Sequence, residues 1–116
     1  MCACLIAVAS TAACSQSVDN SSPEEAFKSF WLSTDCAEIQ SLTDWDFLKA
    51  TFNADDDTLC NTFVSMHQQV RDVQILETQK IDEAKVRVKA VIATAGGPMD
   101  QEDTLVLKNG GWVLGR

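Results

Sequence analysis

The hydrophobic pattern of this chain changes period once, near residue 73, and this change limits the fold more than any other feature. Before it, apolar residues recur every three or four positions, as on the buried face of an amphipathic helix. After it, β-branched residues become frequent and partly alternate with polar ones, which is typical of strands. Helices followed by strands predict an α+β domain, with the helices on one face of a bent antiparallel sheet.

The chain before residue 73 divides into four helical segments, each preceded by residues that favour helix starts. The segments are residues 23–32, 33–42, 43–52 and 55–70. In the first, Ser22 is the expected cap, Pro23 suits the first helical position, and Glu25 completes a capping box. The second has Thr34 or Asp35 as its cap. The side chains expected to face inward are Ala26, Phe27, Phe30, Trp31, Cys36, Ile39, Leu42, Trp45, Leu48, Phe52, Leu59, Phe63, Met66 and Val70.

The second part of the chain predicts a meander of about four strands. The strands are expected at residues 73–80, 84–95, 103–108 and 112–115. Residues 80–84 form a turn, and the Gly-rich and Pro-containing residues 96–101 are expected to form a loop. Asn109 and Gly110 are a strong signal for a two-residue hairpin connection. Short connections of this kind place consecutive strands beside one another in an antiparallel order.

The first dozen residues have the character of an export signal. Residues 2–13 are apolar or small and carry no charge. As a helix they would extend only about 18 Å, too little to cross a hydrocarbon core of about 30 Å. An export signal normally begins with Lys or Arg, whereas here Met1 is followed directly by Cys2, so we expect the true start to lie upstream.

The residues from Ser10 to Cys14 resemble the lipobox of bacterial lipoproteins, in which small residues precede a cysteine that is lipidated and becomes the first residue. Thr11 departs from that pattern, which prefers Leu. The resemblance implies palmitate on Cys14, attachment to a bilayer through it, and a lipid-anchored location in the bacterial cell envelope facing the periplasm. The alternatives are ordinary secretory cleavage and a buried N-terminal helix. The expected divisions are a signal segment at 1–13, a polar tether at 14–22 and a domain at 23–116.

The cysteine count supports the same division of the chain. Of five cysteines, the signal would remove Cys2 and Cys4, and lipid would occupy Cys14. Cys36 and Cys60 remain, and an even pair in an oxidising compartment predicts one disulfide bond. Closing a loop of about 25 residues would stabilise the domain by roughly 3 to 4 kcal/mol. The alternative is a pair of buried free thiols.

Charge and ligand spacing argue against two classes of partner. The net charge is -8, and all of the acidic excess precedes residue 71. Such a chain repels phosphate backbones, so no nucleic-acid partner is expected. Asn53, Asp55 and Asp57 imitate the start of a calcium loop, but Thr58 replaces its glycine and Val64 its bidentate glutamate. We expect no metal and no cofactor.

Three stretches carry a resemblance to a known superfamily: "SPEEAFKSFW" from Ser22, "AKVRVKAVI" from Ala84, and the closing "DTLVLKNGGWVLGR" with Trp112 after the hairpin. Together they resemble the nuclear transport factor 2-like superfamily, and within it small bacterial lipoproteins of unknown function with a lumazine-binding-like domain. The resemblance covers about residues 22–116. It implies a cone-shaped fold that encloses a pocket.

The candidate pocket residues are Trp31, Trp45, His67 and Trp112. Indole rings suit flat ligands, although in a small domain they serve equally well as core. His67 is the only histidine, and the chain has no tyrosine, which ketosteroid isomerases of this superfamily use in their oxyanion hole. We therefore assign no catalytic residue.

The function expected from these features is that of a non-enzymatic binding domain on an envelope lipoprotein. Its ligand is a small hydrophobic molecule or a protein partner, and the sheet offers a surface for a homodimer. One alternative is a small-ligand carrier or an isomerase-like or cyclase-like enzyme with its site in the cone. Another is a protein inhibitor or immunity protein, which is suggested by small size and acidic charge.

Overall fold

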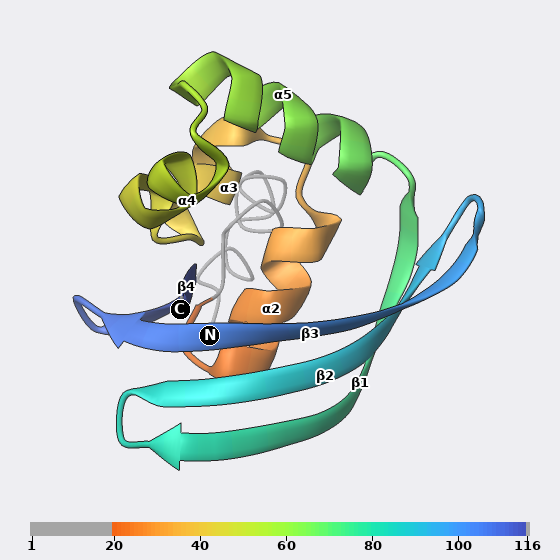
Figure 1. Ribbon diagram of the computed structural model, residues 1–116. Helices are drawn as coiled ribbons and strands as arrows, with labels where there is room; N and C mark the ends of the chain where they lie inside the picture. Colours follow the sequence, from red (N-terminus) through yellow and green to blue (C-terminus); the bar gives the residue numbers. More distant parts are fainter. Residues whose placement is uncertain (1–19, 116) are drawn as a thin grey trace, which may run out of the picture.

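The computed structural model describes residues 20–115, in which helices cover one face of a curved sheet (Figure 1). The predicted signal segment and Cys14 lie outside these residues. The elements, in order, are α2 (Pro23–Leu32), α3 (Cys36–Ser41), α4 (Trp45–Phe52), α5 (Asp56–His67), β1 (Val70–Asp82), β2 (Lys85–Thr94), β3 (Gly97–Lys108) and β4 (Gly111–Gly115). The four strands form one antiparallel sheet in the order β1-β2-β3-β4. The predicted α+β class, with helices first and a four-stranded meander after them, is confirmed.

Each of these helices begins at a polar cap, which explains why the apolar pattern breaks and restarts. The caps Ser22, Asp35, Asp44 and Asp55 accept hydrogen bonds from the backbone N–H groups of Glu25, Ala37, Phe47 and Thr58 at 3.2, 2.9, 3.4 and 2.8 Å. Ser22 caps the first helix as predicted, and Asp35 rather than Thr34 caps the second. Replacing such a cap with Ala typically costs about 0.5 to 2 kcal/mol.

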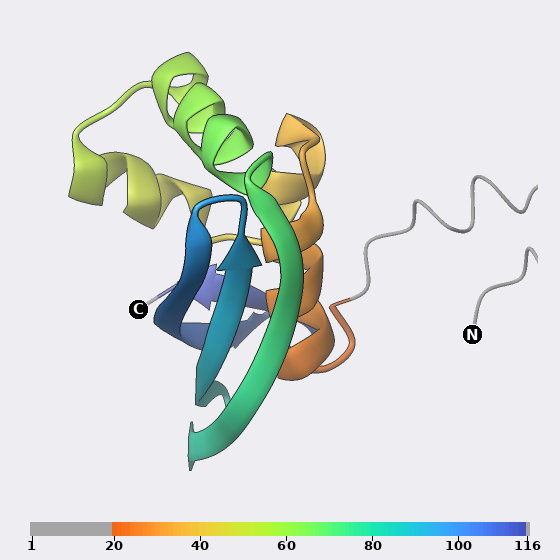
Figure 2. The same ribbon diagram turned by 90° about the vertical axis from the view of Figure 1, so that its right-hand side faces the viewer.

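The core lies between α2 and the concave face of the sheet. Figure 2 shows the bend of the sheet, with α2 against one face and the other helices gathered beyond one end of α2. Strand β2 turns four buried side chains toward the helices, namely Val86, Val88, Ala90 and Ile92. Helix α2 meets them with Ala26, Phe27, Phe30 and Trp31. Three register shifts along β1 bend the outer strand around this core.

The connection between α3 and α4 joins the helical layer to the far edge of the sheet. Leu114 on β4 donates its backbone N–H to the carbonyl of Leu42 at 2.8 Å, and accepts from the N–H of Asp44 at 2.7 Å. Thr43 forms a parallel bridge with Leu114. This edge of β4 is therefore paired, and an edge paired in this way is not free to associate with another chain.

The prediction that residues 96–101 form a loop is wrong for most of these residues. Strand β3 begins at Gly97 and pairs with β2 from Gly97, opposite Thr94, to Gln101, opposite Ala90. Glycine accounts for the sharp turn, because Gly97 adopts a φ of 119°, which other residues rarely adopt. Pro98 is tolerated near the start of a strand. The Gly-Gly-Pro signal marked the turn correctly but not its length.

Val70 was expected on the last turn of the fourth helix, and that prediction is also wrong. Helix α5 ends at His67, and Val70 is the first residue of β1. Val70 follows Met66 at helical spacing, so the sequence pattern continues beyond the point at which the backbone leaves the helix. The residue still packs against the core, now from the sheet.

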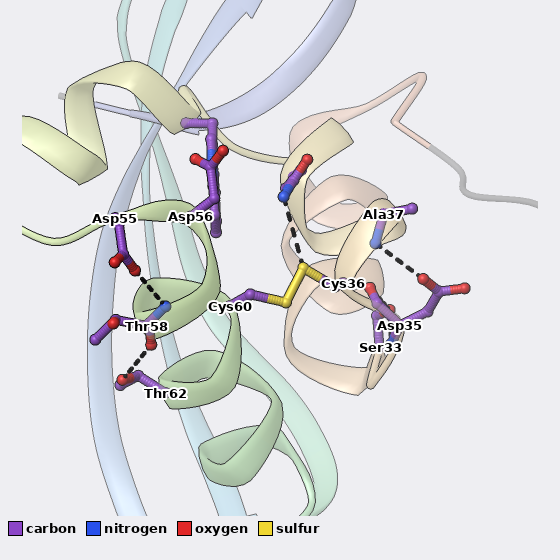
Figure 3. The surroundings of a disulfide bond; sticks show 11 residues. Ser33, Asp35, Cys36, Ala37, Asp55, Asp56, Thr58, Cys60 and Thr62 are labelled. Carbon is purple, nitrogen blue, oxygen red and sulfur yellow. Dashed lines mark hydrogen bonds between the residues drawn. A yellow bond between two sulfur atoms is a disulfide. The ribbon is translucent and has the colours of Figure 1, made fainter.

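The predicted disulfide bond between Cys36 and Cys60 is present and lies between two helices (Figure 3). Cys36 is the first residue of α3, and Cys60 lies within α5. Their Cα atoms are 5.7 Å apart, within the usual range for a disulfide. The bond thus fixes the short α3 against α5.

Candidate functional site

A cavity of about 260 Å³ lies between the helical layer and the sheet. The helices contribute Phe30, Trp31, Leu48, Phe52, Phe63 and Met66 to its wall. The sheet contributes Met99, Gln101, Asp103, Thr104, Leu114 and Gly115. Sites for drug-sized ligands measure about 300 to 1,000 Å³, so this cavity suits a smaller molecule.

The sheet wall of the cavity follows from the alternation of side chains along β3. Met99, Gln101 and Asp103 are separated by two residues each, so they share one face of the strand. Their partners on β2 are Ile92, Ala90 and Val88, all of which are buried beneath the helices. The three β3 side chains therefore also point into the concave face.

The mouth of the cavity is marked by two apolar side chains that line it and remain exposed. Phe52, the last residue of α4, is 58% exposed, and Met66 on α5 is 36% exposed. The predictions that Phe52 and Met66 face inward are therefore wrong. The helix stops there because Asn53 adopts a left-handed backbone with φ of 50°. The Phe52 ring meets Phe63 edge-on at 6.5 Å between centroids, and much of the rest of its surface is open.

Asp103 is a charged side chain in this largely apolar wall. Its Oδ2 accepts from the indole Nε1 of Trp31 at 3.2 Å, and its Oδ1 accepts from Nε2 of Gln101 at 2.9 Å. Burial raises the pKa of the Asp103 carboxyl above its ordinary value. The two hydrogen bonds oppose that shift, whereas the neighbouring Glu102 carboxylate adds to it.

No family model matches this chain, and no curated protein matches it. Its structure is similar to that of a Campylobacter jejuni protein named as an NTF2-like transpeptidase, with a TM-score of 0.55 and 17% identity. The match covers 81% of this chain and 97% of the other. The chain has a nuclear transport factor 2-like (NTF2-like) fold.

A second similar structure is that of a Sec-C motif containing protein from Psychrobacter arcticus, with a TM-score of 0.52 and 16% identity. That match covers 85% of this chain and 60% of the other, so this chain spans about three fifths of that longer chain. At these identities the likeness establishes the NTF2-like fold alone. The ligand must be argued from the residues of the cavity.

His67 lies in the interior of the NTF2-like domain, behind the cavity wall. Only 2% of it is exposed, and its Nδ1–H donates to the carbonyl oxygen of Ser33 at 2.7 Å. The imidazole packs against the rings of Phe30, Trp31 and Phe63 at centroid distances of 4.6, 5.2 and 5.9 Å. Its Nε2 is buried and has no hydrogen-bond partner among the described residues. Burial lowers the pKa of His67, so the ring is neutral near pH 7.

The structure does not bring the four residues predicted to line a pocket together at one site. Trp31 lines the cavity, and His67 contacts the Trp31 ring from behind. Trp45, at the start of α4, donates its Nε1–H to Oδ1 of Asp56 at 2.9 Å. Trp112 is half-buried on β4. The structure thus brings Trp31 and His67 together, and places Trp45 and Trp112 outside the cavity wall.

Asp103 and Gln101, the two polar residues whose side chains meet in the cavity, were not among the predicted site residues. A signal was present, because Asp103, Leu105 and Leu107 alternate along one strand. The two-residue period puts all three on the same face, so an acid occurs in register with apolar residues. An acid in such a position is a candidate for a binding or catalytic group.

Two further properties concern only residues 20–115. No three His, Cys, Asp or Glu side chains in this part of the chain gather in a way that could hold a metal ion. No helix there has the length and apolar character needed to cross a membrane. The described part of the NTF2-like domain offers a largely apolar cavity with a partly buried carboxyl group.

Proposed function

We propose that the NTF2-like domain binds a small, mainly apolar ligand in the cavity between its helices and its sheet. The observation that carries this proposal is the wall itself, in which aromatic and thioether side chains surround one hydrogen-bonded carboxyl group. Ligand sites are commonly apolar pockets with a few polar groups that orient the ligand. The exposed ring of Phe52 at the mouth supports the same conclusion, because a ligand would cover it.

Binding is a better account of this cavity than catalysis. Enzymes that move protons next to a carbonyl stabilise the developing negative charge with free hydrogen-bond donors. The single N–H of the Trp31 side chain already donates to Asp103. His67 is buried behind the wall and donates to Ser33. These two donors are therefore engaged within the protein.

The binding proposal is tested with 2-phenylethanol, a neutral probe of about nine non-hydrogen atoms. We expect saturable binding with a Kd on the order of 1 mM, at a few tenths of a kcal/mol per atom. The indole N–H resonance of Trp31 should shift in nuclear magnetic resonance titrations. Met99→Trp should fill the cavity and abolish the shift. Leu107→Trp is the matched control, because Leu107 is exposed on the same strand and lies outside the wall.

Two results would contradict the binding proposal. One is the absence of any saturable shift with the intact protein. The other is equal binding by the Met99→Trp variant, which would place the probe somewhere else on the surface.

A second candidate function, an isomerase-like enzyme, is favoured by the raised pKa of the Asp103 carboxyl. A carboxylate with a pKa closer to neutrality is a stronger general base than an ordinary one. The test is the isomerisation of 3-cyclohexenone to its conjugated isomer, followed by absorbance. An enzyme should lose roughly 100-fold or more of its rate in Asp103→Asn. A rate equal to that of buffer with the intact protein excludes this reaction.

We also propose that the domain is held at a bacterial membrane through lipid on Cys14, facing the periplasm. The small residues before Cys14 support the lipid, and residues 15–22 supply a polar tether. The disulfide between Cys36 and Cys60 supports an oxidising compartment. Together these features support the proposal of an envelope lipoprotein that presents a small binding domain.

A further inference from the structure

The charge balance of the cavity constrains what it can bind. Among the described residues that line it, Asp103 is the one with a charged side chain. Three cations of the described chain are paired with other acids: Lys49 with Asp56 at 2.9 Å, Arg87 with Glu102 at 3.1 Å, and Lys108 with Asp44 at 3.6 Å. Among residues 20–115, the groups that hydrogen-bond the Asp103 carboxylate are thus the neutral side chains of Trp31 and Gln101.

The Asp103 carboxylate retains capacity for further hydrogen bonds. Its two oxygens together offer about four acceptor positions, and Trp31 and Gln101 use one on each oxygen. A donor from a ligand can therefore be added without displacing either partner. Hydrogen bonds from a charged donor are about twice as strong as those between neutral groups.

The rest of the wall is suited to the body of such a ligand. Aromatic rings carry negative charge on their faces, and these faces attract a cation. Trp31, Phe52 and Phe63 supply such rings, and Met66 and Met99 supply polarisable sulfur. A cavity of about 260 Å³ admits a single ring with a short chain.

From these observations we propose that the ligand is an organic cation, namely a protonated amine on a small apolar or aromatic body, with its ammonium group paired to Asp103. This inference rests on the proposed binding function and specifies its ligand class. The ammonium donates to the free acceptor positions of the carboxylate, and the apolar body fills the space between helices and sheet.

The other charge types are disfavoured by the same geometry. An anionic ligand meets the carboxylate of Asp103 in a cavity where the described wall residues include no Lys, Arg or His. A neutral ligand leaves that carboxylate without a counter-ion after water has been displaced, which is unfavourable in an apolar site. Selectivity of this kind comes from repulsion and desolvation as much as from attraction.

The test compares three probes of nearly equal shape at pH 7.5: 2-phenylethylammonium, 2-phenylethanol and phenylacetate. Affinities for the full chain are measured by calorimetry, and the site is followed through the Trp31 indole resonance. We expect the ammonium probe to bind at least about 10-fold more tightly than the alcohol, as one desolvated charge-assisted contact provides. Phenylacetate should bind most weakly.

Two variants locate the charge that is responsible. Asp103→Asn should weaken binding of the ammonium probe by about 10-fold or more and change that of the alcohol by less than about 2-fold. Asp100→Asn is the matched control, because Asp100 is exposed on the opposite face of the same strand. It removes the same charge and should leave the affinities for both probes unchanged.

The outcomes separate this inference from the function on which it rests. If the alcohol binds as tightly as the ammonium probe, the ligand class is overturned and the binding function stands. A preference for the cation that persists in Asp103→Asn overturns the assignment to Asp103. If no probe binds, both proposals fall. Should Asp103→Asn fail to fold, the order of the three probes on the unaltered protein still decides the ligand class.

Discussion

At the scale of single residues, Asp103 is expected to make the stability of the domain depend on pH. Burial raises the pKa of its carboxyl, so the folded protein retains the proton at pH values where the unfolded chain has lost it. The free energy of unfolding therefore falls as pH rises from the ordinary pKa of 3.8 through the raised value. Each unit between the two pKa values contributes about 1.4 kcal/mol.

Asp103→Asn should remove this loss, because an amide does not ionise. Chemical denaturation of both proteins at pH values between 4 and 7.5 measures the effect. The variant should gain stability relative to the unaltered protein as pH rises. If the free energies of unfolding of the two proteins change with pH by the same amount, the prediction is contradicted.

His67 is expected to make the domain less stable as pH falls, which is opposite to the effect of Asp103. Burial lowers its pKa below the ordinary value of 6.5, so the unfolded chain binds a proton at pH values where the folded protein does not. The free energy of unfolding should therefore fall as pH drops below about 6.5, by up to about 1.4 kcal/mol per pH unit. Denaturation between pH 7.5 and 5 measures this slope.

The control for His67 is the variant His67→Leu, which cannot be protonated. It should be less stable at pH 7.5, because Ser33 loses its hydrogen-bond donor. Its stability should nevertheless change less between pH 7.5 and 5 than that of the unaltered protein. An equal loss in both proteins would assign the acid sensitivity to other groups.

At the scale of elements, the disulfide between α3 and α5 is expected to supply a large part of the stability of the helical layer. Helix α3 has six residues, and helices this short are not stable by themselves in water. Cys36 and Cys60 are separated by 24 positions, for which the chain-entropy model gives about 3.5 kcal/mol. The bond therefore compensates for the weakness of α3.

The double variant Cys36→Ser with Cys60→Ser should lower the free energy of unfolding by about 3.5 kcal/mol. Chemical denaturation with and without a reducing agent measures the effect. The reducing agent should destabilise the unaltered protein and have no effect on the double variant. If the unaltered protein and the double variant are equally stable without the reducing agent, packing alone holds α3.

At the scale of the whole molecule, the cavity results from the way the two layers meet. The sheet is bent by the register shifts of β1, and straight helices cannot follow a concave surface closely. Helix α2 fills the centre with Phe27 and Phe30, which are buried. Space remains where α4 and α5 approach β3, and that space is the candidate site.

The proposed membrane anchor also belongs to this scale, because it decides where the whole domain is held. The gene, with its upstream codons, is expressed in a bacterial host that is fed labelled palmitate. The mature protein should carry label, and Cys14→Ala should carry none. Cys4→Ala is the matched control, because the predicted signal segment is removed, and it should retain the label. Label on the Cys14→Ala protein would refute the anchor.

The sequence by itself determined the features that depend on near neighbours in the chain. Helix caps such as Ser22 and the hairpin at Asn109 are local, because the groups that interact are a few residues apart. The separation of helical and strand periods predicted the α+β class. The pairing of Cys36 with Cys60 followed from their being the two cysteines left for the domain.

Only the tertiary structure decided the cavity, because its wall joins residues that are far apart in sequence. Trp31 and Asp103 are 72 positions apart, and their hydrogen bond exists only once β3 lies across α2. The exposure of Phe52 depends on where α4 stops relative to α5, which helical period does not specify. Local sequence patterns predict which face of an element is apolar. The packing of the helical layer on the sheet decides whether other side chains cover that face or leave a cavity beside it.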